Sequence, residues 1–240
     1  MQIIERIKAK QTDLMGKPAV TIAFLGDSVT QGCFDVYQKS DGNIETYFDQ
    51  DNSYHRHLAK LLAMLYPTVP FNMINAGISG SRAAQGLQRL EQDVLAHNPD
   101  LVVVCFGLND SGGGAECVED YTNALQQIFT RLRKADTEVI FMTPNMMCTH
   151  VSDHITNEAI RQCAEQKSQV QNDGILDFYL LEAKRICAEN DVPVCDCYAK
   201  WQQLYRNGVN ITELLSNKIN HPTKEMNWLF AISLLEQMMQ

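Results

Sequence analysis

Ser28 is the first residue whose position suits chemistry. It follows an apolar run that ends at Gly26, where glycine lets the chain turn sharply. A serine at the start of a helix, just beyond a strand, faces a cleft, and the helix N-terminus favours negative charge that develops beside it. The position predicts a nucleophile, although Gly-Asp-Ser read alone is more simply a helix N-cap.

Two later segments provide groups that suit the binding of an oxyanion. Gly80 follows the second apolar run, and because it has no side chain a substrate oxygen can approach its N–H closely. Asn109 follows the third run, where its side-chain amide can donate to an oxyanion. Read alone, these are an ordinary turn and an Asx turn. Ser79 is not ranked as a nucleophile, because Ser81 stands where a nucleophile elbow requires glycine.

His221 is the candidate base. It stands just ahead of the last helical pattern, with Pro222 suited to the first helical position. An imidazole held there can serve Ser28 as a general base. A lone histidine is more often structural, so the assignment depends on the other segments.

The elements that must position these residues alternate between strand and helix. Five short runs rich in Val, Ile and Phe read as strands buried on both faces: 19–25, 71–75, 101–106, 138–142 and 192–195. Five segments have apolar residues at helical spacing: 54–66, 85–97, 118–134, 175–190 and 227–239. This order predicts a single domain over residues 1–240, an α/β fold with a doubly wound, flavodoxin-like sheet of about five parallel strands.

Two polar segments do not fit the regular units. They are residues 33–52 and residues 144–157. Ligands of open parallel sheets bind beyond the carboxyl ends of the strands. Both segments leave that edge, so we expect them to form walls of a substrate site.

The four segments in this order resemble the SGNH (GDSL) hydrolase family, whose blocks are a Ser in Gly-Asp-Ser, a Gly, an Asn in Gly-x-Asn-Asp, and a His. The resemblance spans Gly26 to His221 and is most specific at residues 107–110. It implies a three-layer α/β/α sandwich with Ser28 as nucleophile and His221 as general base. It also implies an oxyanion hole made of the Ser28 N–H, the Gly80 N–H and the side chain of Asn109.

The sequence departs from this family at one position. The family usually has Asp three residues before the His, and here that residue is Lys218. Three explanations are open, of which we rank first a backbone carbonyl near Lys218 that orients His221. The second is that Glu213, Glu225 or Asn217 folds back to it, and the third is loss of catalysis.

The resemblance implies ester hydrolysis by acyl transfer, with no cofactor or metal. The polar, aromatic-studded segments 33–52 and 144–157 favour a short acyl group, acetyl for example, on a carbohydrate or another polar alcohol. Alternatives are a lipase or thioesterase for longer acyl chains, and a catalytically impaired module that binds a sugar or a flavin.

The composition of the chain limits which partners it is expected to bind and in which cellular compartment it is expected to work. The chain has 240 residues and a formal net charge of -9, which argues against nucleic acid, and no apolar run is long enough for a membrane span. Eight cysteines without zinc-type spacing, and a start without an apolar signal core, predict a cytoplasmic protein. We interpret the histidine pairs 55/57 and 150/154 as residues that do not bind a metal ion. Three questions stay open: whether a leader was removed, whether the protein forms a homo-oligomer, and whether Cys195 and Cys197 have a function.

Overall fold

The fold is built on one parallel sheet. The computed structural model describes residues 1–240, apart from the side chain of Ile44. Five strands lie in the order β4-β1-β5-β6-β7, and all of their pairings are parallel. In chain order these strands are β1 (Val20–Gly26), β4 (Phe71–Gly77), β5 (Leu101–Cys105), β6 (Glu138–Met142) and β7 (Val194–Cys195).

Successive side chains of a strand point to opposite faces of the sheet, which explains why the central strands are apolar throughout. In β1, Ile22 and Phe24 pack into one buried cluster, whereas Ala23 and Leu25 pack into the other. The sheet therefore needs helices on both faces.

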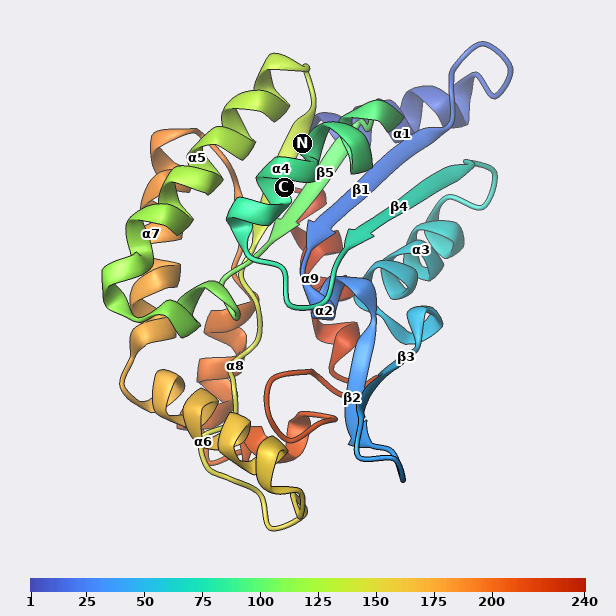
Figure 1. Cartoon of the computed structure of the whole chain (residues 1–240). Coiled ribbons are helices and arrows are strands. Elements are labelled where there is room, and N and C mark those ends of the chain that lie inside the picture. Colours follow the sequence, from blue (N-terminus) through green and yellow to red (C-terminus); the bar gives the residue numbers. More distant parts are fainter.

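The helices form the two outer layers of the sandwich (Figure 1). One cluster joins the sheet to α1 (Gln2–Thr12), α3 (Tyr54–Leu65), α8 (Cys197–Arg206) and α9 (Asn227–Met238). The other joins it to α4 (Ala83–Asp93), α5 (Val118–Lys134) and α7 (Ile175–Glu189). Two further helices are α2 (Ser28–Gln31) and α6 (Glu158–Asn172). None of the helices described is both long and apolar enough to cross a membrane.

The sequence-based predictions of the sheet and of five helices are confirmed, with shifted ends. The fifth strand is shorter than expected because Pro193 has no N–H to give to a ladder. The second predicted helix ends earlier, at Asp93, and a 3-10 turn then leads to Asn98 in the left-handed region at φ 47°. Helices α1, α6 and α8 were not predicted.

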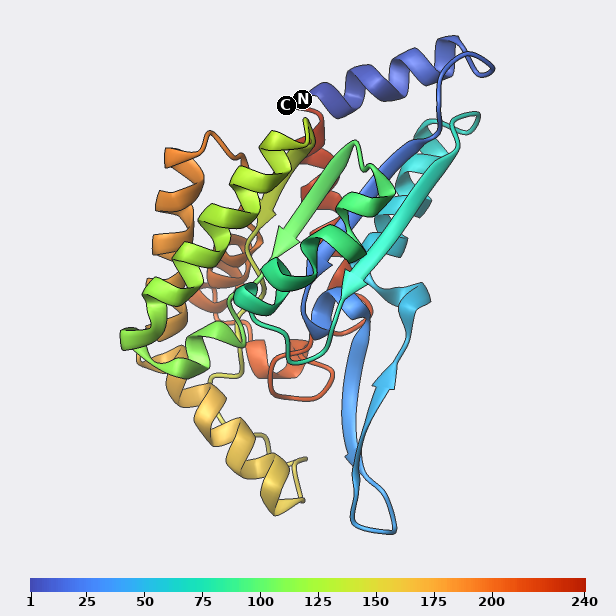
Figure 2. The same ribbon diagram turned by 45° about the horizontal axis from the view of Figure 1, so that its top comes forward.

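The segment 33–52 is more regular than its composition suggested. It contains β2 (Cys33–Gln38) and β3 (Ile44–Phe48), which pair as an antiparallel hairpin outside the main sheet. Figures 1 and 2 show this hairpin extending beyond the carboxyl ends of the parallel strands. Lys224 fixes its base, because it pairs with Asp49 and lies 5.7 Å from the ring centroid of Phe34.

Candidate active site

Ser28 stands at the start of α2, directly after β1. A side chain at Gly26 would bring its Cβ to 2.8 Å from the Cys105 carbonyl oxygen, so the strand must end in glycine. Asp27 is the N-cap, and its carboxylate accepts the Val29 N–H at 3.0 Å. Because Asp27 caps the helix, the Ser28 hydroxyl is free for another partner.

That partner is His221. Ser28 Oγ and His221 Nε2 lie 2.9 Å apart, although the two residues are 193 positions apart in the chain. Both side chains are buried, with 4% and 5% of their surfaces exposed. Burial lowers the pKa of His221 to about 4, so the ring is neutral at pH 7. A neutral imidazole in contact with a hydroxyl can act as its general base when the nitrogen that faces the hydroxyl carries no proton.

The other ring nitrogen of His221 contacts no carboxylate among the described residues. His221 Nδ1 lies 3.1 Å from Asn217 Nδ2 and 3.4 Å from Cys33 Sγ. A backbone carbonyl near Lys218 was ranked first, and this was wrong: Asn217 folds back to the ring. Lys218 instead pairs with Glu213 at 2.8 Å. The carbonyl that raises the pKa of His221 belongs to Phe34.

The expected oxyanion donors come from two turns beside Ser28. Gly80 has φ +75°, a conformation in which glycine is favoured. Within the described residues, neither the Ser28 nor the Gly80 N–H donates a hydrogen bond. Asn109 Nδ2 donates to the Ser81 carbonyl at 3.1 Å and makes a longer contact of 3.4 Å with Asp27 Oδ2. Its second hydrogen is therefore weakly held.

Asp110 has a structural role in the same segment. Its two carboxylate oxygens accept the Ala83 N–H at 2.9 Å and the Gly107 N–H at 3.1 Å. The side chain thus joins the end of β5 to the start of α4. Burial raises the pKa of Asp110 to about 6 and that of Asp27 to about 7.

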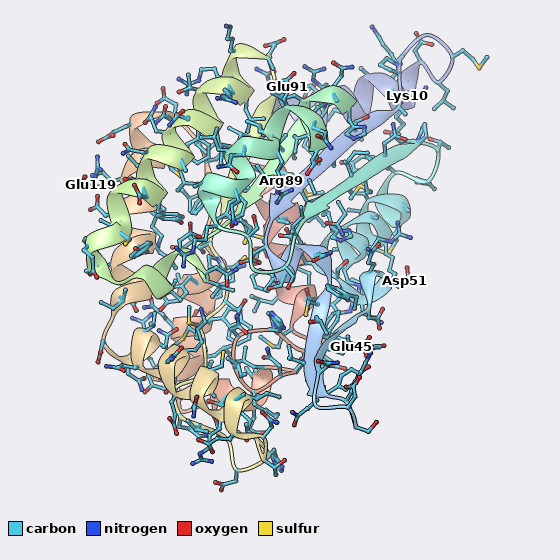
Figure 3. The ribbon with its side chains drawn as sticks, viewed as in Figure 1. Lys10, Glu45, Asp51, Arg89, Glu91 and Glu119 are labelled. Carbon is cyan, nitrogen blue, oxygen red and sulfur yellow. The ribbon has the colours of Figure 1, made fainter. Side chains whose placement is uncertain are left out.

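Two basic residues near the site were missed by the sequence reasoning. Lys167 on α6 donates to the Leu108 carbonyl at 3.1 Å, beside Asn109, and burial lowers its pKa. Arg89 on α4, labelled in Figure 3, donates to the carbonyls of Gly26 and Ala76 at the ends of β1 and β4. Neither residue lies in a motif, so only the fold brings them here.

Three of the other five histidines have partners of their own. His55 Nε2 contacts Ser53 Oγ at 2.8 Å, and His57 stacks on Trp228 with ring centroids 4.0 Å apart. His150 Nδ1 contacts Thr212 Oγ1 at 3.3 Å. No three His, Cys, Asp or Glu side chains in the described part of the chain are grouped to hold a metal ion.

A groove of about 700 Å³ runs between the hairpin and the segment that leads into α6. Asp35, Tyr37 and Gln38 line one side, His154 and Asn157 the other. Asn217 connects the groove to the candidate site, because it lines the groove and also contacts His221. Both segments predicted as walls therefore contribute, although His150 is not among the lining residues.

A second hollow of about 440 Å³ lies against the turn that carries Gly80. Gly80 and Ser81 line it together with Gln85, Gln88 and Gln92 of α4.

Comparison with known proteins finds a related sequence. An acetylxylan esterase from Geobacillus stearothermophilus is 26% identical over 132 residues, which cover 51% of this chain and 58% of that protein. The chain therefore matches less than two thirds of the length of this relative.

Solved structures show the same fold. An acetyl-xylooligosaccharide esterase from Geobacillus superposes with a TM-score of 0.67 at 21% identity, covering 91% of this chain and 93% of that one. A two-domain esterase active on acetylated mannans gives a TM-score of 0.68 at 20% identity, covering 98% of this chain and 51% of that one.

The family model for the GDSL-like lipases and acylhydrolases matches residues 24–229. This range includes Ser28, Gly80, Asn109 and His221. The chain therefore belongs to the GDSL-like lipase/acylhydrolase family, the SGNH hydrolases that its four sequence blocks resemble.

Proposed function

We propose that the protein is a serine hydrolase that cleaves carboxylic esters, with Ser28 as nucleophile and His221 as general base. The observation that carries the proposal is the 2.9 Å contact between Ser28 Oγ and His221 Nε2 at the carboxyl edge of the sheet. Membership of an acylhydrolase family supports it.

In this mechanism Ser28 Oγ attacks the ester carbonyl while His221 Nε2 takes the hydroxyl proton. The oxyanion receives hydrogen bonds from the Ser28 N–H, the Gly80 N–H and the Asn109 side chain. Preorganised donors of this kind stabilise the tetrahedral intermediate because they need no reorganisation during the reaction. The protonated His221 then gives its proton to the leaving alkoxide, and a water molecule activated by His221 hydrolyses the acyl-Ser28. The reaction requires no metal or cofactor.

Lys167 fits this mechanism as a source of positive potential. Its ammonium group lies beside the backbone that carries Asn109. Because a buried charge is screened less than an exposed one, the group favours negative charge on a nearby oxyanion.

The proposed substrate is a short acyl ester, acetyl for example, of a carbohydrate. The groove supports this, because hydroxyl groups of a sugar can pair with Gln38, Asn157 and the carboxylate of Asp35, while Tyr37 offers a ring surface. The relatives with acetylated xylan and mannan as substrates support the same class.

The test is a comparison of acyl chain lengths. Acetyl and octanoyl p-nitrophenyl esters, and acetylated xylooligosaccharides, are offered to the wild type and to Ser28→Ala. We expect faster turnover of acetyl esters, release of acetate from the sugar, and a loss of about 10² in kcat in Ser28→Ala, because a Ser-His pair without its acid has less activity to lose than a complete triad. Ser168→Ala, on the exposed side of α6, is the matched control.

Each alternative has its own signature in this experiment. Faster octanoyl turnover would favour a lipase or thioesterase. Binding of the oligosaccharide without Ser28-dependent hydrolysis would favour a catalytically impaired sugar-binding protein. Equal activity of wild type and Ser28→Ala would remove Ser28 from its proposed role.

We also propose that the protein works in the cytoplasm. All eight cysteines are free, and Cys195 Sγ lies 3.8 Å from Cys197 Sγ without a bond between them. Unpaired buried thiols suit a reducing compartment. Fractionation of the source cells would test this, and recovery of the protein outside the cell would contradict it.

A further inference from the structure

Two groups that can donate a hydrogen bond lie beside Nδ1 of His221. Asn217 Nδ2 lies 3.1 Å away and Cys33 Sγ 3.4 Å away. Burial raises the pKa of Cys33 to about 12, so the group is a thiol at neutral pH. In a Ser-His-Asp enzyme the corresponding nitrogen carries a proton and donates it to a carboxylate. Here, by contrast, the group nearest to Nδ1 is the NH₂ of Asn217, which donates a hydrogen bond instead of accepting one.

The orientation of the Asn217 amide is fixed by its other end. Asn217 Oδ1 accepts the backbone N–H groups of Ile219, Asn220 and His221, each at 3.0 Å. Backbone N–H groups only donate, so this end must be the oxygen. The two Nδ2 hydrogens then point at Asn220 Oδ1 and at His221 Nδ1, each 3.1 Å away. A flipped amide would place NH₂ against three donors.

We propose that Asn217 is a positioning residue that sets the tautomer of His221: by donating to Nδ1, it holds the imidazole proton on Nε2, where it points at Ser28 Oγ. This inference rests on the proposed function, in which Nε2 must be free to accept a proton. The resting ring must therefore lose its proton from Nε2 and gain one on Nδ1 before Ser28 can be activated. In that second form, Cys33 Sγ and the Phe34 carbonyl are the acceptors near the ring.

The Phe34 carbonyl is the one backbone acceptor that raises the pKa of His221. The Ser28 hydroxyl from α2 and the Cys33 thiol from β2 contact the ring, and the charge of Lys167 on α6 lowers the pKa of His221 further. Within hydrogen-bond distance of Nδ1 the described residues provide no carboxylate. A carboxylate placed at position 217 is thus the smallest change that reverses the polarity.

Asn217→Asp tests the proposal through activity. One carboxylate oxygen would keep the three backbone N–H groups and the other would accept the Nδ1 proton, while the Asn220 amide turns to donate. In a Ser-His-Asp enzyme the opposite change, from acid to amide, costs about 10⁴ in kcat because it selects the wrong tautomer. We expect kcat for p-nitrophenyl acetate to rise at least tenfold and the acid limb of the pH profile to move to higher pH.

Lys218→Asp is the matched control. It restores the carboxylate at the position where the family usually has it, but the Lys218 side chain points to Glu213, and its backbone is in the left-handed region at φ +57°. We expect no gain in kcat. A gain in Lys218→Asp equal to that of Asn217→Asp would overturn the assignment to Asn217, as would a folded Asn217→Asp whose kcat does not rise.

A spectroscopic measurement tests the tautomer without using activity. In the wild type labelled with ¹⁵N-histidine, the His221 signals are identified by their loss in His221→Gln. We expect a proton on Nε2 in the wild type and on Nδ1 in Asn217→Asp. A wild-type ring with its proton on Nδ1 would overturn the proposal even if Asn217→Asp did not fold. Absence of Ser28-dependent hydrolysis would count instead against the proposed function.

Discussion

The two ends of the Ser28–His221 contact are built in different ways. Ser28 is placed by regular structure, since it follows a central strand and begins a helix. His221 is placed by a loop between α8 and α9, seen in orange-red in Figure 1. The loop is held by backbone hydrogen bonds from Ser216 N–H to the His221 carbonyl and from Cys148 N–H to the Ile219 carbonyl, each 2.7 Å.

This difference teaches that the position of the base and its protonation are separate problems. The backbone and the Asn217 oxygen fix where the ring stands. They do not provide the acceptor that a carboxylate would give to Nδ1. At the nucleophile end, by contrast, regular structure fixes Ser28, and neither its N–H nor that of Gly80 has a partner in the described residues.

Asn109→Ala removes the side-chain amide that we propose as a hydrogen-bond donor to the oxyanion. Loss of one donor typically lowers kcat by about 10²–10³, and we expect a loss in this range on acetyl esters with little change in KM. Steady-state kinetics check this. A loss below threefold would show that Asn109 lies outside the oxyanion hole.

Asp110→Asn tests whether the residue after Asn109 serves the stability of the fold instead of catalysis. The amide oxygen of the new asparagine can accept only one of the two N–H groups, from Ala83 or from Gly107. The NH₂ group then lies against the other N–H, which loses its acceptor. An unsatisfied buried donor costs about 1–3 kcal/mol, so we expect the free energy of unfolding to fall by that amount in a urea titration. Asp120→Asn, at an exposed position of α5, serves as control; equal stability of the two variants would contradict the structural role of Asp110.

The pH dependence sharpens the comparison at the histidine end. Burial lowers the pKa of His221 from 6.5 to about 4, and only the neutral ring can act as a base. We therefore expect kcat/KM to hold as the pH falls from 7 to 5 and to decline through about pH 4, while circular dichroism shows that the protein stays folded. A decline centred near 6.5 would mean that the ring is hydrated or paired with an acid.

The sequence predicted most of the sheet because its strands are apolar on both faces, as in residues 101–105. It missed α6, whose residues are mostly polar and of which only Ala164 and Gln171 are buried. A helix of this kind has too narrow an apolar stripe for periodicity to detect. Position 218 was seen to lack the usual acid, but the contact of Asn217 with His221 depends on how one tight turn folds.

Other parts of the site could not be read from the chain at all. Cys33, Lys167 and Arg89 reach the site from β2, α6 and α4. None of them stands at a spacing that marks a motif, and only tertiary packing brings them together. For the groove, the sequence indicated both walls through the polar segments 33–52 and 144–157, but not which of their side chains line it.

The most direct test of the central claim is labelling with a fluorophosphonate probe followed by peptide mapping, since such probes report an activated serine. We predict one adduct, on the peptide that contains Ser28, and its disappearance in His221→Ala. An adduct on another serine, or an unlabelled Ser28 in a folded and ester-hydrolysing protein, would contradict the account.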